Sequence, residues 1–320
     1  RQPGPMPRPP DEDPRWEAPL VNARLRKRFL KGGLKIAAIG PRPDLTFPYE
    51  HLGEGTAALA AVARGEGFGA VLKGAKNPAI ILGMGALARA DGGAVLALAR
   101  QAAEREGWNG FNVWHPAAAR VGGLLLGCLP GAGGKARDAI LAGAASGEIQ
   151  AVFLLGADEL PAGSLGKAFV VYQGHHGDAG AARADVILPG AAYTEKNGTY
   201  VNIEGRVQLG RLAVFPPGEA REDWTIIRAL SEFLGQRLPY DNLGQVRAAL
   251  IAANPRFARL DEAAPGAWGE FGQSGALSAE PFRSPVADYY RTDPISRASA
   301  TMAECSATFV RPLPATGTGA

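Results

Sequence analysis

Two histidines and an aspartate, His175, His176 and Asp178, are the sharpest candidate for a chemical site. Two imidazoles and a carboxylate are suitable ligands for zinc or non-haem iron. Adjacent histidine side chains should point in different directions, however, so chelation of one ion by both from a single loop is awkward. We therefore expect a structural role, in which one imidazole hydrogen-bonds to nearby backbone or lines an interface with a partner subunit.

A second polar cluster comprises Glu195, Asn202, Glu204 and Arg206. Neighbouring glycines would let the backbone approach a phosphate, and arginine pairs with anions through two hydrogen bonds. This pattern invites a cofactor-binding interpretation. The alternative, which we favour, is that Glu204 and Arg206 form a structural pair or contact another subunit.

Residues 83–88 have the Gly-x-Gly-x-x-Ala spacing of a dinucleotide-binding loop, in which backbone amides and a helix N-terminus hold a pyrophosphate. The next helix is expected to start only at Gly92, and no acidic residue is placed to take a ribose. We favour a structural turn, with a free Rossmann-like nucleotide binder as the alternative. His115 is assigned no chemistry, because a lone histidine beside a tryptophan is more often a hydrogen-bonded structural residue.

Three short apolar runs position the two clusters, at residues 152–155, 169–172 and 186–188. Short aliphatic runs stopped by glycine or proline indicate buried strands. Because the runs are apolar throughout, we expect a parallel sheet covered on both faces. The polar segment after the third run would then lie at the carboxyl end of the sheet, where α/β folds place ligands.

Strands and helices alternate along the chain. This alternation predicts an α/β fold with a doubly wound, mostly parallel sheet, a helical C-terminal extension and an extended tail. Further strands are expected at residues 36–39 and 79–82. Helices are expected at residues 20–30, 56–63, 92–106, 135–145, 219–234, 243–253 and 294–304, the last two with Asn242 and Asp293 as N-caps.

Composition limits the classes of function. The 320 residues are 46% hydrophobic, enough for one large core or two modest ones. The formal net charge of +3 argues against nucleic acid as the main partner. No apolar run approaches the roughly 20 residues that span a bilayer. Cys128 and Cys305 are too few for an iron–sulfur cluster or a structural zinc site, and we expect reduced thiols.

Motifs over nearly the whole chain carry a family resemblance. They include Gly-His-His-Gly-Asp at residues 174–178, Ala-Asp-Val-Ile-Leu-Pro at 184–189 and Asn-Ile-Glu-Gly-Arg at 202–206. Together these resemble the molybdopterin-oxidoreductase-like domain of the G subunit of respiratory complex I, the 75-kilodalton iron–sulfur subunit in mitochondria. Further matching segments lie at residues 13–20, 22–24, 221–224, 238–241 and 293–299.

The resemblance implies a non-catalytic scaffold in the peripheral arm of an ion-translocating NADH–quinone oxidoreductase, supporting electron transfer from NADH to quinone. The family carries its 2Fe-2S and 4Fe-4S clusters in an N-terminal region, so no cofactor is expected in this chain. Implied partners are flavin-bearing and iron–sulfur subunits, with no nucleic acid and only indirect membrane contact. The implied location is the cytoplasmic face of the bacterial inner membrane, or the matrix side. Because the sequence starts at Arg1, we expect a C-terminal portion of the family's protein.

The alternative is a stand-alone molybdopterin-dependent oxidoreductase of formate dehydrogenase type. In those enzymes, the segment that corresponds to Glu195, Asn202, Glu204 and Arg206 lies close to the pterin guanine dinucleotide. They continue into a sizeable β-barrel domain, whereas two helices and a loose tail are expected after Gln208. No molybdenum ligand can be placed either. We therefore expect a vestigial pterin-side segment, with no catalytic or cofactor-binding residue and no metal.

Four regions are expected along the chain. Residues 1–14 are proline-rich and expected to be disordered or extended. Residues 15–217 should form the α/β molybdopterin-oxidoreductase-like domain, and residues 218–254 a helical pair packed on it. Residues 255–320 are expected to form an extended arm, a short helix and a frayed tail. Tryptophans expected as interface anchors are Trp16, Trp108, Trp114 and Trp268.

Overall fold

The computed structural model describes residues 17–104, 110–161, 163–263 and 266–310. The chain divides into two compact units. Unit 1 lies within residues 1–117, 265–292 and 301–320, and unit 2 comprises residues 118–264 and 293–300. The last part of the chain therefore contributes to both units. The expected boundaries at residues 14, 217 and 254 rest on composition and stay predictions.

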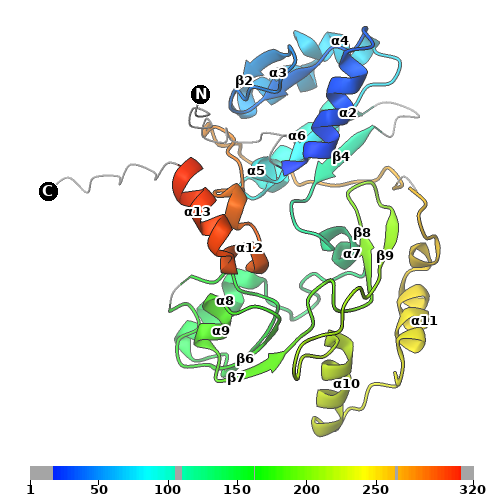
Figure 1. Ribbon diagram of the computed structural model, residues 1–320. Helices are drawn as coiled ribbons and strands as arrows, with labels where there is room; N and C mark the ends of the chain where they lie inside the picture. The colour runs from blue at the N-terminus through cyan, green and yellow to red at the C-terminus, as the bar shows by residue number, and fades with distance from the viewer. Residues whose placement is uncertain (1–16, 105–109, 162, 264–265, 311–320) are drawn as a thin grey trace, which may run out of the picture. The chain divides into compact units, whose positions relative to one another are not determined.

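Unit 1 contains two small parallel sheets. Strand β1 (Ala37–Ile39) pairs with β2 (Glu50–Gly53), and β3 (Ile80–Gly83) pairs with β4 (Phe111–Trp114). The helices of unit 1 are α2 (Pro19–Phe29), α3 (Thr56–Arg64), α4 (Phe68–Gly74), α5 (Met84–Leu87), α6 (Gly92–Ala103), η2 (Tyr289–Arg291) and α13 (Ala300–Phe309) (Figure 1). The strands predicted at 36–39 and 79–82 and the helices predicted at 20–30 and 56–63 are confirmed to within one residue.

The core of unit 1 joins distant parts of the chain. Leu59 of α3, Leu82 of β3 and Val95 of α6 are buried together, with Ala86 and Ala99 as small residues between the elements. Phe282, from the segment expected to be an extended arm, is only 2% exposed in the same cluster. That segment is therefore an integral part of unit 1.

A charged contact also holds this segment in place. The two oxygens of Asp91 accept hydrogen bonds from Nε and Nη2 of Arg89, at 2.8 and 3.1 Å. Asp91 also accepts a 2.8 Å hydrogen bond from the backbone N–H of Ser278, while Arg89 donates to the carbonyl of Glu280 at 2.8 Å. The hydrogen bonds from Arg89 and then from Ser278 lower the pKa of Asp91 from 3.8 to about 2.

Asp91→Asn is expected to make unit 1 less stable than the wild type at neutral pH. A carboxylate whose folded pKa lies below its unfolded pKa stabilises the protein above the unfolded value, and that contribution is lost as pH falls. The stability difference between wild type and variant should therefore shrink as pH falls from about 4 to about 2. Thermal melts across this range test the effect, with the exposed Asp138→Asn as the matched control. A difference that stays constant with pH would contradict the assignment.

Unit 2 is built around a three-stranded parallel sheet of order β5-β6-β7. Its strands are β5 (Ala151–Leu155), β6 (Phe169–Gly174) and β7 (Val186–Pro189), which confirm the three predicted runs. A separate antiparallel pair joins β8 (Gly198–Val201) to β9 (Val207–Gly210). The helices are α7 (Arg120–Leu125), α8 (Arg137–Ser146), α9 (Ala179–Arg183), α10 (Asp223–Phe233), α11 (Leu243–Ala253), η1 (Pro255–Ala258) and α12 (Pro294–Ala298).

The two faces of the β5-β6-β7 sheet differ. On one face, Leu154, Val170 and Tyr172 are buried in a cluster that includes residues of α8 and α9 (Figure 1). The other face exposes a group of apolar side chains, each 40–54% exposed: Phe153, Leu155, Phe169 and Val186. The prediction that both faces are covered is therefore wrong for this part of the sheet, although Gln173 on the same face is fully buried. Apolar runs show that both faces are apolar and not what covers them.

Four predicted helices have different bounds. The helix expected at 92–106 is α6, which ends at Ala103, and the helix expected at 135–145 is α8, which spans Arg137–Ser146. The helix expected from residue 219 begins at Asp223, because residue 221 is extended: its N–H donates to Pro189 O at 3.1 Å and its carbonyl accepts from Ala191 N at 2.8 Å. The helix expected at 294–304 is two helices, α12 and α13, separated at Ser299, which has an extended ψ of 122°. The N-caps Asn242 and Asp293 are confirmed.

Pairing is mostly parallel: of the four sheets in the described ranges, three are parallel. The prediction that the chain combines helices with mostly parallel strands is thus confirmed, while the doubly wound arrangement of the sheet stays a prediction. Among these residues, no helix has the length and apolar character needed to cross a membrane. Both cysteines are free, as predicted. The expectations for residues 1–14, Trp16, Trp108 and residues 311–320 lie outside the described residues.

Candidate functional site

Tyr172 fixes the loop that carries the two histidines. Its hydroxyl lies 2.6 Å from Oδ2 of Asp158 and 2.9 Å from the carbonyl oxygen of His176. The other carboxylate oxygen of Asp158 accepts a 3.1 Å hydrogen bond from the N–H of Gly180 in α9. A Cβ added at Gly174 would stand 2.2 Å from the Tyr172 hydroxyl, so only glycine fits at the strand end. Burial, followed by the bond to Asp158, raises the pKa of Tyr172 and keeps it neutral.

The two histidines contact each other. Their Nδ1 atoms are 2.7 Å apart, and the rings meet edge to face with centroids 5.0 Å apart. The expectation that adjacent rings point apart is wrong here. The contact requires one ring to donate a proton and the other to accept it. Burial lowers the pKa of His175, and its neighbours His176 and Lys196 act in the same direction, so His175 favours the neutral form.

Asp178 is bound by an arginine and not grouped with the histidines. Its carboxylate forms an ion pair with Nε of Arg297, whose Nη2 also donates to Glu159 at 2.8 Å. Within the part of the chain that the structure describes, no three His, Cys, Asp or Glu side chains gather so as to hold a metal ion. The Nδ1 atoms of the two histidines face each other, and the carboxylate of Asp178 faces Arg297.

The second predicted cluster is split between two loops. Asn202 Oδ1 accepts hydrogen bonds from the N–H groups of Glu204 and Arg206, at 2.9 and 3.0 Å, and so closes the turn between β8 and β9. Arg206 lies 3.7 Å from Glu204 and donates to the carbonyl of Asp261. Glu195 instead accepts a 2.9 Å bond from Ala192 N in its own loop. The structural pair of Glu204 and Arg206 is thus present in the turn.

Three further polar residues meet at the carboxyl end of β6, and the sequence did not indicate that they would. Gln173, fully buried, donates to the Oδ1 of Asp223 at 3.0 Å. The other oxygen of Asp223 is paired with the ammonium of Lys196. A glutamine directly after the apolar run at residues 169–172 was the available signal, because a buried amide needs a polar partner. Asp223 lies in the first turn of α10, and that position also brings it to the strand end.

Tyr172→Phe is expected to lower the free energy of unfolding of unit 2 by about 1–3 kcal/mol, because it leaves the buried carboxylate of Asp158 without one of its donors. Urea unfolding measures the loss. Tyr193→Phe is the matched control, since Tyr193 is 62% exposed and should change stability little. Equal stability of the two variants would show that the hydroxyl does not support Asp158.

The glycine-rich stretch at residues 83–88 runs directly into the short helix α5, with Gly85 and Ala86 buried. The expected structural turn is therefore a single helical turn. Gly92 approaches the preceding turn closely, since an added Cβ would stand 2.0 Å from the carbonyl oxygen of Leu87. The N-cap of α6, Asp91, already binds Arg89 and Ser278. These contacts favour a packing role for this stretch over pyrophosphate binding.

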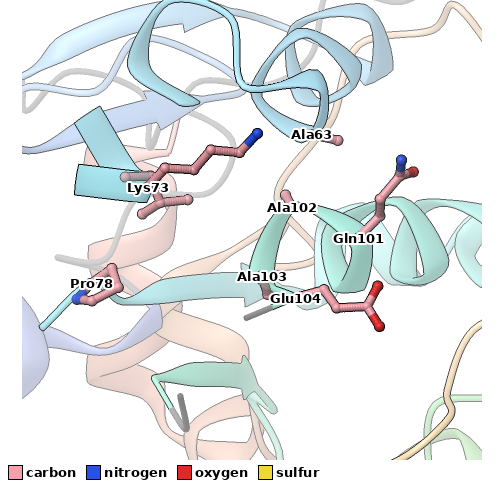
Figure 2. Close-up of a pocket in the computed structure, with 8 residues that line it drawn as sticks. Ala63, Lys73, Pro78, Gln101, Ala102, Ala103 and Glu104 are labelled. Carbon is pink, nitrogen blue, oxygen red and sulfur yellow. The ribbon is translucent and has the colours of Figure 1, made fainter. Parts of the chain in front are cut away.

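A separate cavity of about 440 Å³ lies in unit 1, away from the predicted site residues (Figure 2). Its walls combine small or apolar side chains with three polar ones, Lys73 on one side and Gln101 and Glu104 on the other. The cavity shares no residue with the histidine loop, the turn at Asn202 or the stretch at residues 83–88. It is lined by Ala63, Leu72, Lys73, Pro78, Gln101, Ala102, Ala103 and Glu104.

Comparison with known proteins identifies the family. Residues 11–233, more than half of the chain, match the molybdopterin oxidoreductase family. The chain belongs to that family. Residues 263–305 match a second family, the C-terminal region of the G subunit of NADH-ubiquinone oxidoreductase. The predicted resemblance is thereby confirmed.

Curated relatives of this molybdopterin oxidoreductase family member carry complex I names. The mitochondrial NADH-ubiquinone oxidoreductase 78 kDa subunit of Neurospora crassa is 43% identical over 312 residues, covering 92% of this chain and 40% of that protein. The G subunit of the NADH-quinone oxidoreductase of Rickettsia bellii is 41% identical over 299 residues, covering 92% and 42%. The NADH-ubiquinone oxidoreductase 75 kDa subunit of Reclinomonas americana is 39% identical, covering 92% and 43%. The chain spans about two fifths of each relative.

The family name raises the question whether the pterin-side segment fits a pterin dinucleotide. A dinucleotide needs donors that are open to phosphate oxygens. Here Arg206 donates a hydrogen bond to the carbonyl oxygen of Asp261 and forms an ion pair with Glu204. Lys196 forms an ion pair with Asp223. Asn202 is used to close its own turn. These residues are committed to contacts within the chain and do not fit that group.

Proposed function

We propose that this chain is a non-catalytic scaffold region of the G subunit in the peripheral arm of an ion-translocating NADH–quinone oxidoreductase. The observation that carries the proposal is the pair of family matches. The molybdopterin oxidoreductase match is followed at residues 263–305 by a match to the C-terminal region of the G subunit. A stand-alone molybdopterin enzyme has no need of the second segment, and it is not favoured.

In this proposal the chain supports electron transfer from NADH to quinone without carrying an electron itself. Iron–sulfur clusters would belong to regions of the relatives that this chain does not cover, and the chain would bind no cofactor. The neighbours would be flavin-bearing and iron–sulfur subunits, at the cytoplasmic face of the inner membrane or the matrix side. The β5-β6-β7 sheet would be part of a doubly wound α/β architecture inherited from pterin enzymes.

The exposed apolar face of the β5-β6-β7 sheet supports a role in subunit contact. Phe153, Phe169 and Val186 lie on one face at 40–50% exposure. Parallel sheets are normally covered on both faces, and contiguous apolar surface on a soluble protein marks an interaction site. Large aromatic side chains are also the usual anchors of such interfaces. This face is the proposed contact surface for the rest of the peripheral arm.

Co-purification tests the proposal. A tagged chain, expressed in cells that assemble complex I, should bring down the flavin-bearing and iron–sulfur subunits. The double variant Phe153→Ser, Phe169→Ser should recover at least about tenfold less of them. Leu20→Ser, at a residue that is 79% exposed in unit 1, is the control and should behave as the wild type. Recovery of the chain alone, without any respiratory subunit, would overturn the proposal.

A further inference from the structure

The segment 293–300 presents one arginine from a rigid turn. Asp293 caps α12 by accepting from the N–H groups of Ile295 and Ser296, at 2.9 and 3.1 Å. The Oγ of Ser296 accepts a hydrogen bond from the N–H of Asp293 at 3.1 Å, which completes a capping box. Pro294 at the first helical position limits the backbone further. The turn is therefore preorganised, and little conformational freedom is lost when its arginine binds.

Arg297 projects from this turn into a pair of carboxylates. Its side chain is only 16% exposed and is bound by both Asp178 and Glu159. Each carboxylate takes a different nitrogen of the guanidinium, Nε for Asp178 and Nη2 for Glu159. The planar fork of arginine suits such two-point binding, which a lysine cannot reproduce.

Tyr172 helps to position the carboxylates of Asp178 and Glu159. Asp158, which precedes Glu159, is bound to the Tyr172 hydroxyl, and the same hydroxyl lies 2.9 Å from His176 O, two residues before Asp178. Tyr172 thus holds the two loops that supply the carboxylates. The Gly-His-His-Gly-Asp loop therefore has a definite structural role, because it places Asp178 for Arg297.

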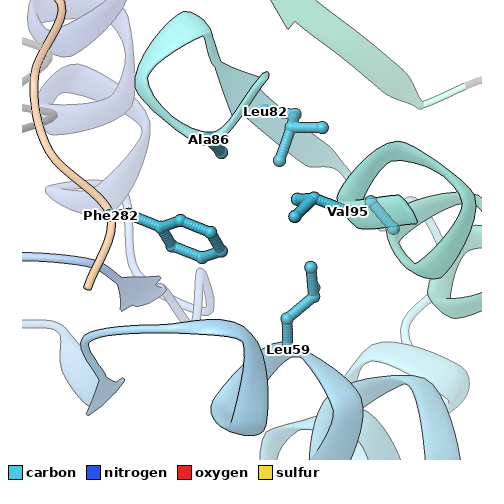
Figure 3. Packing of buried hydrophobic residues seen from close by; sticks show 6 residues of the cluster. Leu59, Leu82, Ala86, Val95 and Phe282 are labelled. Atoms are coloured by element: carbon cyan, nitrogen blue, oxygen red, sulfur yellow. The ribbon is translucent and has the colours of Figure 1, made fainter. Parts of the chain in front are cut away.

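The segments on both sides of this turn belong to unit 1. Before the turn, Phe282 points into the core of unit 1 among Leu59, Leu82 and Val95 (Figure 3). Thr56 donates to the carbonyl of Ser278 at 2.7 Å. After the turn, residues 301–310 again belong to unit 1. Only residues 293–300 of this stretch are assigned to unit 2.

We propose that Asp178 and Glu159 form an internal docking site for the arginine-bearing turn 293–300, and that this contact holds the turn within unit 2. The occupant is a segment of the same chain, and the recognition is between one guanidinium and two carboxylates. Release of the turn would free residues 293–300 while the cores of both units stay folded.

Hydrogen exchange of the full chain tests the docking of this turn. In Arg297→Leu, the amides of Arg297 and Ser299, which close α12, should exchange at least about tenfold faster than in the wild type. Amides in the ladder of β6 should be unchanged. Arg291→Leu removes an exposed arginine from the same segment and serves as the control, with no change expected. No acceleration, or a rise in exchange throughout unit 2, would overturn the proposal.

A second variant separates docking from a general loss of positive charge. Asp178→Asn should accelerate exchange at the same amides, and combining it with Arg297→Leu should add little, because Arg297→Leu already removes the contact with Asp178. Arg297→Lys keeps the charge but should still release the turn at least severalfold. Fully additive effects in the double variant, or wild-type exchange in Arg297→Lys, would contradict the two-point docking site.

Discussion

Phe282→Ala is expected to lower the free energy of unfolding of unit 1 by about 3–5 kcal/mol, the usual cost of removing a buried phenylalanine ring. Phe282 is 2% exposed and packs with Leu59, Leu82 and Val95 (Figure 3). The Arg89 guanidinium also lies 5.1 Å from the centre of its ring. The loss would therefore affect both the core and the charged contact at Asp91.

Differential scanning calorimetry of the full chain measures this effect. The transition of unit 1 should move to a clearly lower temperature, and that of unit 2 should stay in place. Leu277→Ala is the matched control, because Leu277 lies five residues earlier in the same segment and is 39% exposed. If the two variants melted alike, the segment around Phe282 would not be part of the core.

Gly272→Ala is expected to destabilise unit 1 by about 3 kcal/mol or more, through left-handed strain of about 1–2 kcal/mol and a backbone clash. Gly272 has φ +80°, which L side chains rarely adopt. An added Cβ would stand 2.3 Å from the backbone nitrogen of Ala97 and 2.6 Å from its Cα. The obstacle is the backbone of α6, which cannot move aside as a flexible side chain could.

Gly269→Ala provides the control for this prediction. Gly269 lies in the same segment, has an ordinary φ, and would meet nothing within 4 Å if a Cβ were added. Chemical denaturation of the two variants should show a large loss at Gly272 and almost none at Gly269. Comparable losses at both positions would contradict the close approach to α6.

Local patterns predicted the elements of this fold that depend on neighbouring residues. The apolar runs at β5, β6 and β7 and the N-caps at Asn242 and Asp293 are readable because each signal lies within a few residues. The start of α10 could not be predicted from local patterns, because residue 221 is held extended by hydrogen bonds with Pro189 and Ala191. The role of Phe282 depends on a core assembled from distant segments.

The candidate site shows the same division. The sequence singled out His175, His176 and Asp178, and the structure places them in one loop. It did not reveal that Asp178 binds Arg297, 119 residues further along the chain. Asn202, Glu204 and Arg206 meet in one turn as their spacing suggests, whereas Glu195 caps a different loop. Long-range ion pairs of this kind leave no periodic signal in a single sequence.

Metal and pterin analysis of the chain after anaerobic purification tests the central claim most directly. The claim is that a molybdopterin oxidoreductase fold serves here as architecture, with Arg206 and Lys196 committed to internal partners. Molybdenum, tungsten and extracted pterin should each be far below one equivalent per chain. Stoichiometric metal together with a pterin dinucleotide, lost on substitution of Arg206, would contradict it.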